Sequence, residues 1–183
     1  MTETELIQSA QLGDRDAFAG LVACHEKKLL ALCWNMMGDR EEARDAAQEA
    51  LLQAFQNFAR FDAGRSFAKW LLGIGAKRCL DRLRKRRTFL KYFQEFGREG
   101  NGATQPGPEG PADAPAMGDA GDGRAGRLLQ KLTPKERVAI SLAVFDDFSA
   151  REIAALQGCS ESTVRVRLFN ARVKLKKEVA DGL

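Results

Sequence analysis

Residues 60–91 read RFDAGRSFAKWLLGIGAKRCLDRLRKRRTFLK, a stretch that opens with a short turn and continues as one helix. Its first half carries apolar side chains at helical spacing: Phe67, Trp70, Leu71 and Ile74. This spacing predicts packing into a core. The second half is densely basic and is opposed only by Asp81. A core-anchored helix with a cationic exposed face is the usual electrostatic footprint of a phosphate-backbone partner, and a solvated charge run is the alternative.

Helical periodicity also dominates the residues before this stretch. A short helix is expected from Thr4 to Leu12, and a second helix with one apolar stripe is expected to end at Gly38. Asp39 is suited to cap a third helix, whose many alanines allow neighbouring helices to approach closely. No stretch shows the period-two alternation of a strand. The sequence therefore predicts an all-α fold whose first domain is a helical bundle spanning residues 1–96.

The composition changes abruptly after residue 96. Glycine, alanine and four of the five prolines dominate residues 97–126, which contain almost no large apolar side chain. Such a segment cannot bury enough surface to offset its ordering entropy, so we expect a disordered linker here. A linker of this kind tethers two modules without fixing their separation. The second small helical domain is expected to span residues 127–183.

The second domain carries the pattern of a helix-turn-helix. Capping boxes at Thr133–Glu136 and Ser149–Glu152 predict two helix starts. The sequence Gly158-Cys159-Ser160 then forms a tight turn, after which a longer basic helix begins at Glu161. A short helix, a turn containing glycine and a longer basic helix are typical of DNA-binding domains, with a plain helical hairpin as the alternative.

The longer helix separates into two faces. Val164, Leu168, Ala171 and Leu175 recur at steps of three and four and are expected to pack inward. An exposed Phe169 suits contact with thymine methyl groups, while arginine and asparagine suit guanine and adenine. Other cations are expected to contact phosphates. The DNA-facing residues predicted here are Ser160, Ser162, Thr163, Arg165, Val166, Arg167, Phe169, Asn170, Arg172 and Lys174.

Composition excludes several other classes of protein. The chain has 183 residues, a net charge of +4, one histidine and four widely separated cysteines. This pattern gives no zinc-ligand spacing and no disulfide framework, so we expect reduced core cysteines, no metal and no cofactor. No nucleophile–base pair or phosphate loop indicates an enzyme. An acidic N-terminus, and no apolar run near the roughly 18 residues of a membrane span, predict a cytoplasmic protein without membrane insertion.

Taken together, the two ordered segments resemble one family, the bacterial RNA polymerase sigma factors of the extracytoplasmic-function class. The matching residues of the first domain are GDREEARDAAQEALLQAF (38–55), RFD (60–62) and FAKWLLGIGAKRCLDRLRKRR (67–87). Those of the second domain are LTPKERVAISL (132–142) and SAREIAALQGCSESTVRVRLFNARVKL (149–175). The single motifs are loose, but their order and separation make the joint match specific.

The resemblance implies three binding surfaces. The third helix corresponds to the docking surface for core RNA polymerase, in particular the clamp coiled coil of the largest subunit; the polymerase flap is a further expected contact. Its expected docking residues are Asp45, Gln48, Glu49, Leu52 and Phe55. The loop from Arg60 and the following helix correspond to the element that captures the melted minus-ten strand of promoter DNA. Its expected residues are Arg60, Phe61, Asp62, Trp70, Lys77, Arg78, Arg82, Lys85 and Arg86. The last helix corresponds to the reader of the minus-thirty-five duplex.

Other interpretations remain open at this stage. The spacing of Trp70 also fits a core position better than a stacking platform. Lys77, Val166 and Asn170 depart from residues that are common in the family, so the promoter sequence is not transferable from relatives. An anti-sigma factor is a further expected partner. The competing function is an autonomous helix-turn-helix regulator that binds palindromic DNA as a dimer. A helical interaction protein without a nucleic-acid role is weaker, because it leaves Phe169 and the basic faces unexplained.

Overall fold

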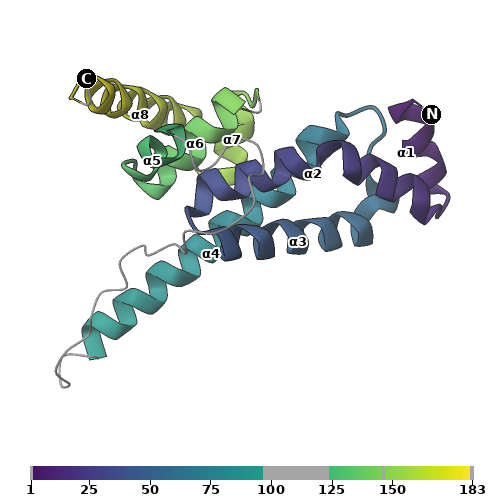
Figure 1. The fold of residues 1–183 in the computed structure, drawn as a ribbon, viewed down its shortest axis with the longest axis horizontal. Coiled ribbons are helices and arrows are strands. Elements are labelled where there is room, and N and C mark those ends of the chain that lie inside the picture. The colour runs from purple at the N-terminus through teal and green to yellow at the C-terminus, as the bar shows by residue number, and fades with distance from the viewer. Residues whose placement is uncertain (1, 97–123, 146, 182–183) are drawn as a thin grey trace.

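Helices account for nearly all the ordered structure. The computed structural model describes residues 2–96, 124–145 and 147–181, and no strand occurs among them, as predicted (Figure 1). The helices are α1 (Glu3–Gln11), α2 (Arg15–Met37), α3 (Arg40–Asn57), η1 (a short 3-10 helix, Phe58–Arg60), α4 (Phe67–Phe96), α5 (Arg124–Gln130), α6 (Pro134–Phe145), α7 (Ala150–Gln157) and α8 (Glu161–Asp181). The all-α fold is therefore confirmed.

The N-terminal bundle is built on α2, α3 and α4, which pack against one another in pairs, while α1 covers α2. The alanines of α3 face the other two helices and are buried, as their spacing predicted. Gly75 of α4 has no room for a side chain, since an added Cβ atom would overlap Leu29 of α2. Small residues thus bring the three helices close together.

Local polar contacts fix the helix ends that the sequence indicated. Gly38 ends α2 with a left-handed φ of 72°, and the Asp39 carboxylate accepts the Glu42 N–H at the start of α3. Glycine tolerates this φ without the steric cost that a Cβ atom imposes. The Ser149 and Glu152 capping box begins α7, and Ser160 accepts a backbone N–H in the first turn of α8. These caps set where each helix begins and hence which residues share a face.

An aromatic cluster fills the end of the bundle nearest the loop that precedes α4. It joins Phe18, Phe58, Phe61, Phe67 and Trp70. The Phe61 and Trp70 ring centroids lie 4.9 Å apart, and Phe67 is fully buried beneath them. Because each ring contacts several others, the cluster holds the start of α4 firmly against α2 and η1.

The predicted linker falls mostly on residues 97–123, which lie outside the described residues. The structure begins α5 at Arg124, so residues 124–126 belong to a helix and not to the linker as expected from their composition. Arg124 and Ala125 are exposed and Gly126 is buried within α5.

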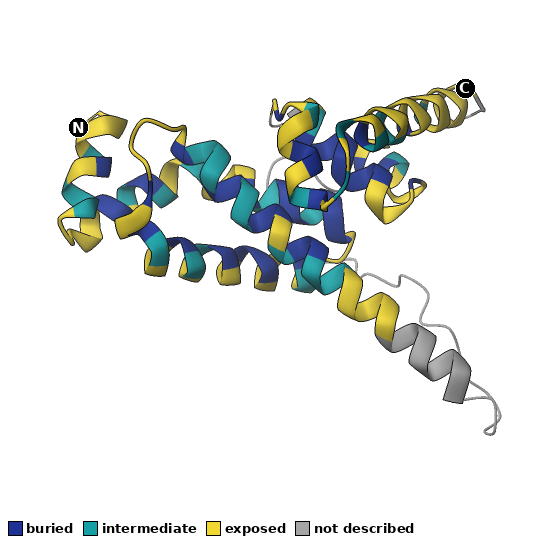
Figure 2. Cartoon of the chain, turned by 180° about the vertical axis from the view of Figure 1, so that it is seen from behind, coloured by how far each residue is buried: buried dark blue, intermediate teal, exposed yellow. Residues whose placement is uncertain are grey.

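The two helical domains lie in direct contact, which the sequence did not predict. α6 packs against α2, and α7 packs against α4. Val138 and Leu142 of α6 and Ile153 of α7 belong to the same buried cluster as the N-terminal bundle. Figure 2 shows the buried residues continuing from the bundle into the C-terminal helices. Apolar burial between the two domains therefore fixes the distance between them, which the sequence had led us to expect would vary.

Candidate polymerase and DNA surfaces

α8 has the two faces that its sequence predicted. Val164 and Ala171 are fully buried, and Leu168 and Leu175 are partly buried. On the opposite side Val166 is 58% exposed and Phe169 is 66% exposed, with Asn170 exposed beside them. Large apolar side chains held outward on an anchored helix are unusual on a merely solvated surface. This outward face, defined by Arg165, Val166, Phe169 and Asn170, is called the reading face below.

A buried carboxylate helps to anchor α8. Glu136 of α6 accepts hydrogen bonds from Lys174 Nζ at 2.8 and 2.9 Å and from the Thr133 hydroxyl at 2.9 Å. Burial alone raises the pKa of Glu136, but the hydrogen bonds from Lys174 and Thr133 outweigh it and leave that pKa below its ordinary value. Lys174 thus holds α8 on α6 while its side chain stays 45% exposed, and the phosphate contact predicted for it stays a prediction.

Arg167, for which a phosphate contact is predicted, also contacts side chains of its own domain. Its guanidinium donates to the Gln157 side chain, and it lies 3.1 Å from the Cys159 sulfur in the turn before α8. Gln157 in turn donates to the Lys135 carbonyl oxygen at 3.0 Å. Arg167 therefore fixes the angle between α7 and α8, which sets how the reading face is presented.

One exposed apolar residue of α8 was missed in the sequence. Val173 is 52% exposed and lies one turn beyond Phe169 on the same side. The signal was present, because the spacing 166, 169 and 173 follows helical steps of three and four. Val173 extends the apolar strip toward the C-terminal half of α8.

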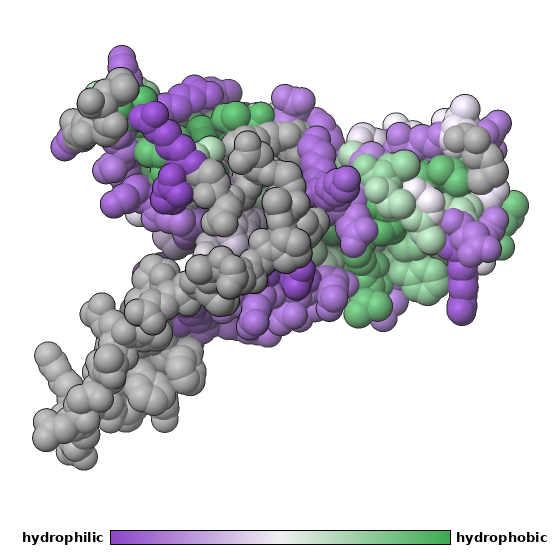
Figure 3. Space-filling view, in the orientation of Figure 1, coloured by the Kyte–Doolittle hydropathy of each residue, from purple (hydrophilic) through white to green (hydrophobic). Residues whose placement is uncertain are grey.

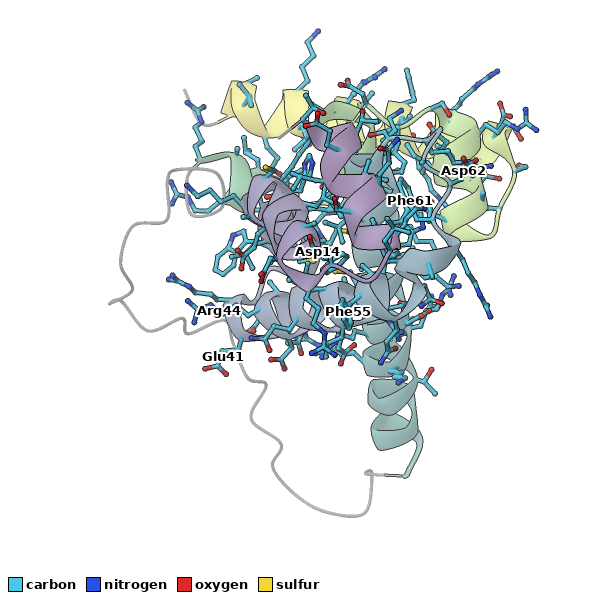
Figure 4. All side chains as sticks on the ribbon, turned by 90° about the vertical axis from the view of Figure 1, so that its right-hand side faces the viewer. Asp14, Glu41, Arg44, Phe55, Phe61 and Asp62 are labelled. Carbon is cyan, nitrogen blue, oxygen red and sulfur yellow. The ribbon has the colours of Figure 1, made fainter. Side chains whose placement is uncertain are left out.

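The predicted docking residues lie together on the exposed side of α3. Asp45, Gln48, Leu52 and Phe55 follow helical steps along one face, and all four are exposed. Figure 3 shows a hydrophobic surface over the C-terminal end of α3 beside a hydrophilic stretch over its first part. In Figure 4, Phe55 projects from α3 below the turn that holds Asp14. An exposed strip that is polar at one end and apolar at the other is suited to a protein partner.

The cations of α4 do not form the separate surface that was expected. Arg82 donates to Glu49 at 2.7 Å and lies 3.7 Å from Asp45, so it neutralises two predicted docking residues. Arg78 donates to the Gln53 side chain at 2.8 Å, and Arg86 lies 3.8 Å from a Glu42 oxygen. α3 and α4 are neighbours in the bundle, so their opposite charges pair with each other.

The contact between Arg82 and Glu49 shifts the pKa values of both side chains. The hydrogen bond from Arg82 lowers the pKa of Glu49, against a smaller opposing effect of burial. The reciprocal hydrogen bond raises the pKa of Arg82. Lys77 and Lys85 remain exposed on α4. The basic helix therefore divides into cations that adjoin α3 and cations that face solvent.

The loop before α4 is a preformed turn. The Asp62 carboxylate accepts the Gly64 N–H at 3.0 Å and lies 3.3 Å from Arg65, while Gln11 of α1 donates to the Phe61 carbonyl oxygen at 2.7 Å. Arg60 and Asp62 are exposed. Figure 4 shows Phe61 and Asp62 on this connection between α3 and α4.

The two aromatic residues predicted to contact the melted strand differ in their exposure to solvent. Phe61 is only 4% exposed, because its ring stacks on Phe58 within the aromatic cluster, so this ring is not presented to a base. Trp70 is part of the same cluster and is half-buried. Trp70 therefore packs in the core, which was the alternative considered from the sequence, and part of its side chain stays exposed.

The four cysteines differ in their burial. Cys33 and Cys79 are buried as expected, whereas Cys24 is exposed and Cys159 is half-buried. A hydrogen bond with Cys79, together with burial, raises the pKa of the Cys33 thiol well above its ordinary value, which favours the unreactive thiol. Within the described ranges no cluster of three His, Cys, Asp or Glu side chains is suited to a metal ion. Among the helices described, none combines the length and apolar character that crossing a membrane requires.

Comparison with known proteins finds a family model for each of the two helical domains. The family model described as Sigma-70 region 2 matches residues 21–89, and the model described as Sigma-70, region 4 matches residues 123–175. These ranges contain the surface of α3 and α4 and the helix-turn-helix with its reading face. The class defined by the fold and its surfaces is therefore a two-domain, DNA-binding transcription factor of the sigma-70 type.

Whole-chain relatives narrow the assignment. The chain is 34% identical over 179 residues to the ECF RNA polymerase sigma factor SigW of Bacillus subtilis, covering 96% of this chain and 95% of that protein. It is 31% identical to the RNA polymerase sigma-H factor of Pseudomonas aeruginosa, covering 96% of this chain and 92% of the relative. The chain belongs to the extracytoplasmic-function sigma factors. It is a transcription initiation factor that acts with RNA polymerase, and it is not an enzyme.

Solved structures share the arrangement of helices. CnrH, determined in complex with the cytosolic domain of CnrY, matches with a TM-score of 0.62 and 26% identity over 98% of this chain and 97% of that one. The sigma factor RpoE of Bartonella quintana, determined with the anti-sigma factor NepR, matches with a TM-score of 0.64 and 23% identity over 89% of this chain and 96% of that one. The autonomous dimeric regulator gives way to the sigma-factor interpretation, because both domains match sigma-70 regions.

Proposed function

We propose that this sigma factor guides core RNA polymerase to promoters through three surfaces that act in different steps. The exposed strip of α3 docks on the polymerase, with the clamp coiled coil of the largest subunit as its partner. The reading face of α8 binds the minus-thirty-five duplex. The loop before α4, with Arg60 and Asp62, and α4 itself, with Trp70 and Lys77, hold the melted minus-ten strand.

One observation carries the DNA-binding part of this proposal. The reading face is held outward on a helix whose opposite side is fixed by Val164, Ala171 and the Glu136–Lys174 contact. A rigid helix with apolar side chains beside arginine and asparagine is suited to read base edges in a major groove. Exposed cations nearby, such as Arg172, would add salt-dependent affinity without sequence preference.

Binding energy, not catalysis, would drive promoter opening. Duplex contact by α8 anchors the complex, and capture of unpaired bases by the loop and α4 shifts the equilibrium toward the open promoter. The half-buried Trp70 is suited to stack on a base, and the exposed Lys77, about two turns further along α4, is suited to hold a phosphate of the same strand. The polymerase then carries out the chemistry, so the activity of this chain belongs in the cytoplasm.

An anti-sigma factor is the proposed regulator. CnrH, which shares the fold over nearly the whole chain, has been determined with the cytosolic domain of a second protein. The exposed strip of α3, with Leu52 63% exposed, is a surface that such a partner would cover in competition with the polymerase.

The test is promoter-specific transcription by bacterial core RNA polymerase supplied with the purified chain. Transcripts from a pool of genomic fragments, sequenced at their starts, are expected to share two elements upstream. Gln48→Ala/Leu52→Ala is expected to abolish polymerase binding, whereas Glu26→Ala/Lys27→Ala on the exposed side of α2 serves as the matched control. A wild-type chain that binds DNA as a dimer and never joins the polymerase would contradict the proposal.

A further inference from the structure

Two thiols that the proposed function does not use lie between α2 and α4. Cys33 of α2 and Cys79 of α4 are fully buried, and both are free cysteines. The Cys33 sulfur lies 3.7 Å from the position that a Cβ atom on Gly75 would occupy, so it touches α4 about one turn before Cys79. A hydrogen bond joins the two thiols. The bundle therefore holds a pair of sulfur atoms together between two helices.

The direction of α2 and α4 places these thiols at the same level. Near the start of α4, the His25 ring centroid lies 5.5 Å from that of the first α4 residue, and further along Leu29 lies against Gly75. Residue numbers thus rise together along the two helices, which run in the same direction. One further turn on each helix leads from this second contact to Cys33 and Cys79. The two cysteines therefore face each other across the helix pair.

Close packing at Gly75 brings the two backbones within reach of a disulfide. An added Cβ atom there would overlap Leu29, so only glycine allows this approach. The axes of packed helices lie about 8–10 Å apart and Cα atoms lie about 2.3 Å from each axis. Facing Cα atoms therefore come within the roughly 7 Å that a disulfide allows. The pair Cys33 and Cys79 meets this requirement without unfolding either helix.

Hydrogen peroxide can oxidise such a pair in two steps. The sulfur of one thiolate attacks a peroxide oxygen, the O–O bond breaks, and a sulfenic acid forms while the departing hydroxide is protonated to water. The second sulfur then attacks the sulfenic sulfur, so that the S–S bond forms and the S–O bond breaks. The hydroxide that leaves takes the proton of the second thiol. In total the two sulfur atoms lose two electrons, and peroxide is reduced to two waters.

Burial makes this reaction slow and its product durable. The hydrogen bond with Cys79, together with burial, raises the pKa of the Cys33 thiol, so little thiolate is present to attack peroxide. Peroxide also reaches the sulfurs only when the helices open locally. The same burial protects a disulfide from thiolate reductants, because exchange requires direct attack on a sulfur atom. The pair is therefore suited to respond to sustained oxidation and not to a brief exposure.

From the position of these thiols we infer that Cys33 and Cys79 form a reversible disulfide under sustained oxidation by hydrogen peroxide, and that this bond makes polymerase docking sensitive to redox state. Reduction by a dithiol restores the two thiols. Peroxide supplies the oxidising equivalents and the dithiol the reducing ones, so no bound cofactor takes part.

The bond would change the contact between α4 and α3. It draws the sulfurs closer together, while Leu29 and Gly75 prevent further approach at their own level, so α4 tilts about that point. Arg82, which follows Cys79 on α4, then moves relative to Glu49, to which it donates at 2.7 Å. A displacement of about 1 Å is enough to break a hydrogen bond of this length. The consequence for docking rests on the proposed function, because Glu49 is one of the predicted polymerase contacts.

Mass spectrometry tests the disulfide without any polymerase. A chain carrying Cys24→Ser and Cys159→Ser keeps only the pair, and prolonged treatment with hydrogen peroxide is expected to remove two hydrogen atoms from its intact mass. Digestion without reductant should release one cross-linked peptide that contains Cys33 and Cys79, and dithiothreitol should separate it. The Cys33→Ala and Cys79→Ala chains in the same background are the matched controls and should form no such peptide. Two intact thiols after treatment, or sulfinic acid in place of the cross-link, would overturn the inference.

Polymerase affinity of the same chains tests the consequence. The oxidised pair is expected to change the affinity by up to about fivefold, the limit set by the exposed Arg82–Glu49 contact, and in the same direction as Arg82→Met. Peroxide-treated Cys33→Ala controls for oxidation elsewhere and should bind like its untreated form. Equal affinity of the oxidised and reduced pair refutes redox-sensitive docking while the proposed function stands. If the reduced chain and the wild type both fail to bind polymerase, the proposed function itself fails, and the disulfide is still decided by its mass.

Discussion

The two basic helices, α4 and α8, use their charges differently. Arg82 and Arg86 of α4 pair with the Glu49 and Glu42 carboxylates of α3, so part of the positive charge on α4 is already neutralised within the bundle. α8 turns Lys174 inward, where it anchors the helix, and keeps its outer face free for Phe169 and its neighbours. A count of basic residues is therefore a poor guide to a nucleic-acid surface, because the neighbours of each cation decide its role. This comparison is sharpened by substitutions that change either the charges that hold a helix in place or the side chains that face a binding partner.

The largest effect is expected at the anchor of α8. Glu136→Gln keeps the shape of the side chain but removes the charge that Lys174 and Thr133 contact, which should lower the free energy of unfolding by about 1–3 kcal/mol. Chemical denaturation monitored by circular dichroism measures this loss. Glu178→Gln, on the exposed side of α8, is the matched control and should lie within about 0.5 kcal/mol of wild type.

The anchor also predicts a dependence on pH. The pKa of Glu136 is lower in the folded chain than its ordinary value of 4.5, so its stabilisation is fully present above that value. Stability is lost as the pH falls from about 4.5 through the lowered folded pKa, because the unfolded chain then binds the proton first. Wild type should therefore lose stability more steeply than Glu136→Gln in this acidic window. Equal slopes for the two chains would show that Glu136 does not anchor α8.

Sequence reasoning was most successful where local chemistry decides the outcome. The cap at Ser149, the turn at Gly158 and the inward face of α8 were predicted because capping and periodicity depend on residues three or four positions away. The partners of Arg82 and Lys174 lie 33 and 38 positions away along the chain. No periodicity within one helix reports on such distant pairs.

The contact between the domains was missed for a related reason. Lys69 of α4 donates to the Asp147 carbonyl oxygen, 78 positions further along the chain, and its pattern on α4 is that of any exposed lysine in a basic helix. Val138 and Leu142 of α6 are buried in the same cluster as the N-terminal bundle, but sequence alone does not tell which core an apolar residue joins. Burial is therefore predicted more readily than the identity of the packing partner.

A smaller effect, on binding and not on folding, is expected at the reading face. Phe169→Ala should leave stability nearly unchanged, because the ring is 66% exposed, yet weaken binding to the minus-thirty-five duplex by about 1–2 kcal/mol, roughly tenfold. The loss should be largest for sequences in which a thymine methyl meets the ring. Fluorescence anisotropy with duplexes altered one base pair at a time measures both effects.

Arg172→Ala provides the contrast for this measurement. It should weaken all duplexes about equally and reduce the slope of log affinity against log salt by about 1, as expected for a phosphate contact. If Phe169→Ala instead weakened every duplex equally and Arg172→Ala changed sequence preference, the roles assigned to Phe169 and Arg172 would be reversed.

The smallest effect is expected from the charges of α4 that pair with α3. A double-mutant cycle with Arg82→Met and Glu49→Gln isolates their interaction, and the Glu49 side chain is 48% exposed, so solvent screening limits the coupling to about 0.2–1 kcal/mol. Polymerase affinity measured on the same four chains then separates two roles for Glu49. If Arg82→Met alone strengthens docking, Arg82 withholds Glu49 from the polymerase; if it weakens docking, Arg82 orients Glu49 for the polymerase. No change in either stability or docking would leave the pair without function, and the contrast with α8 would then rest on the reading face alone.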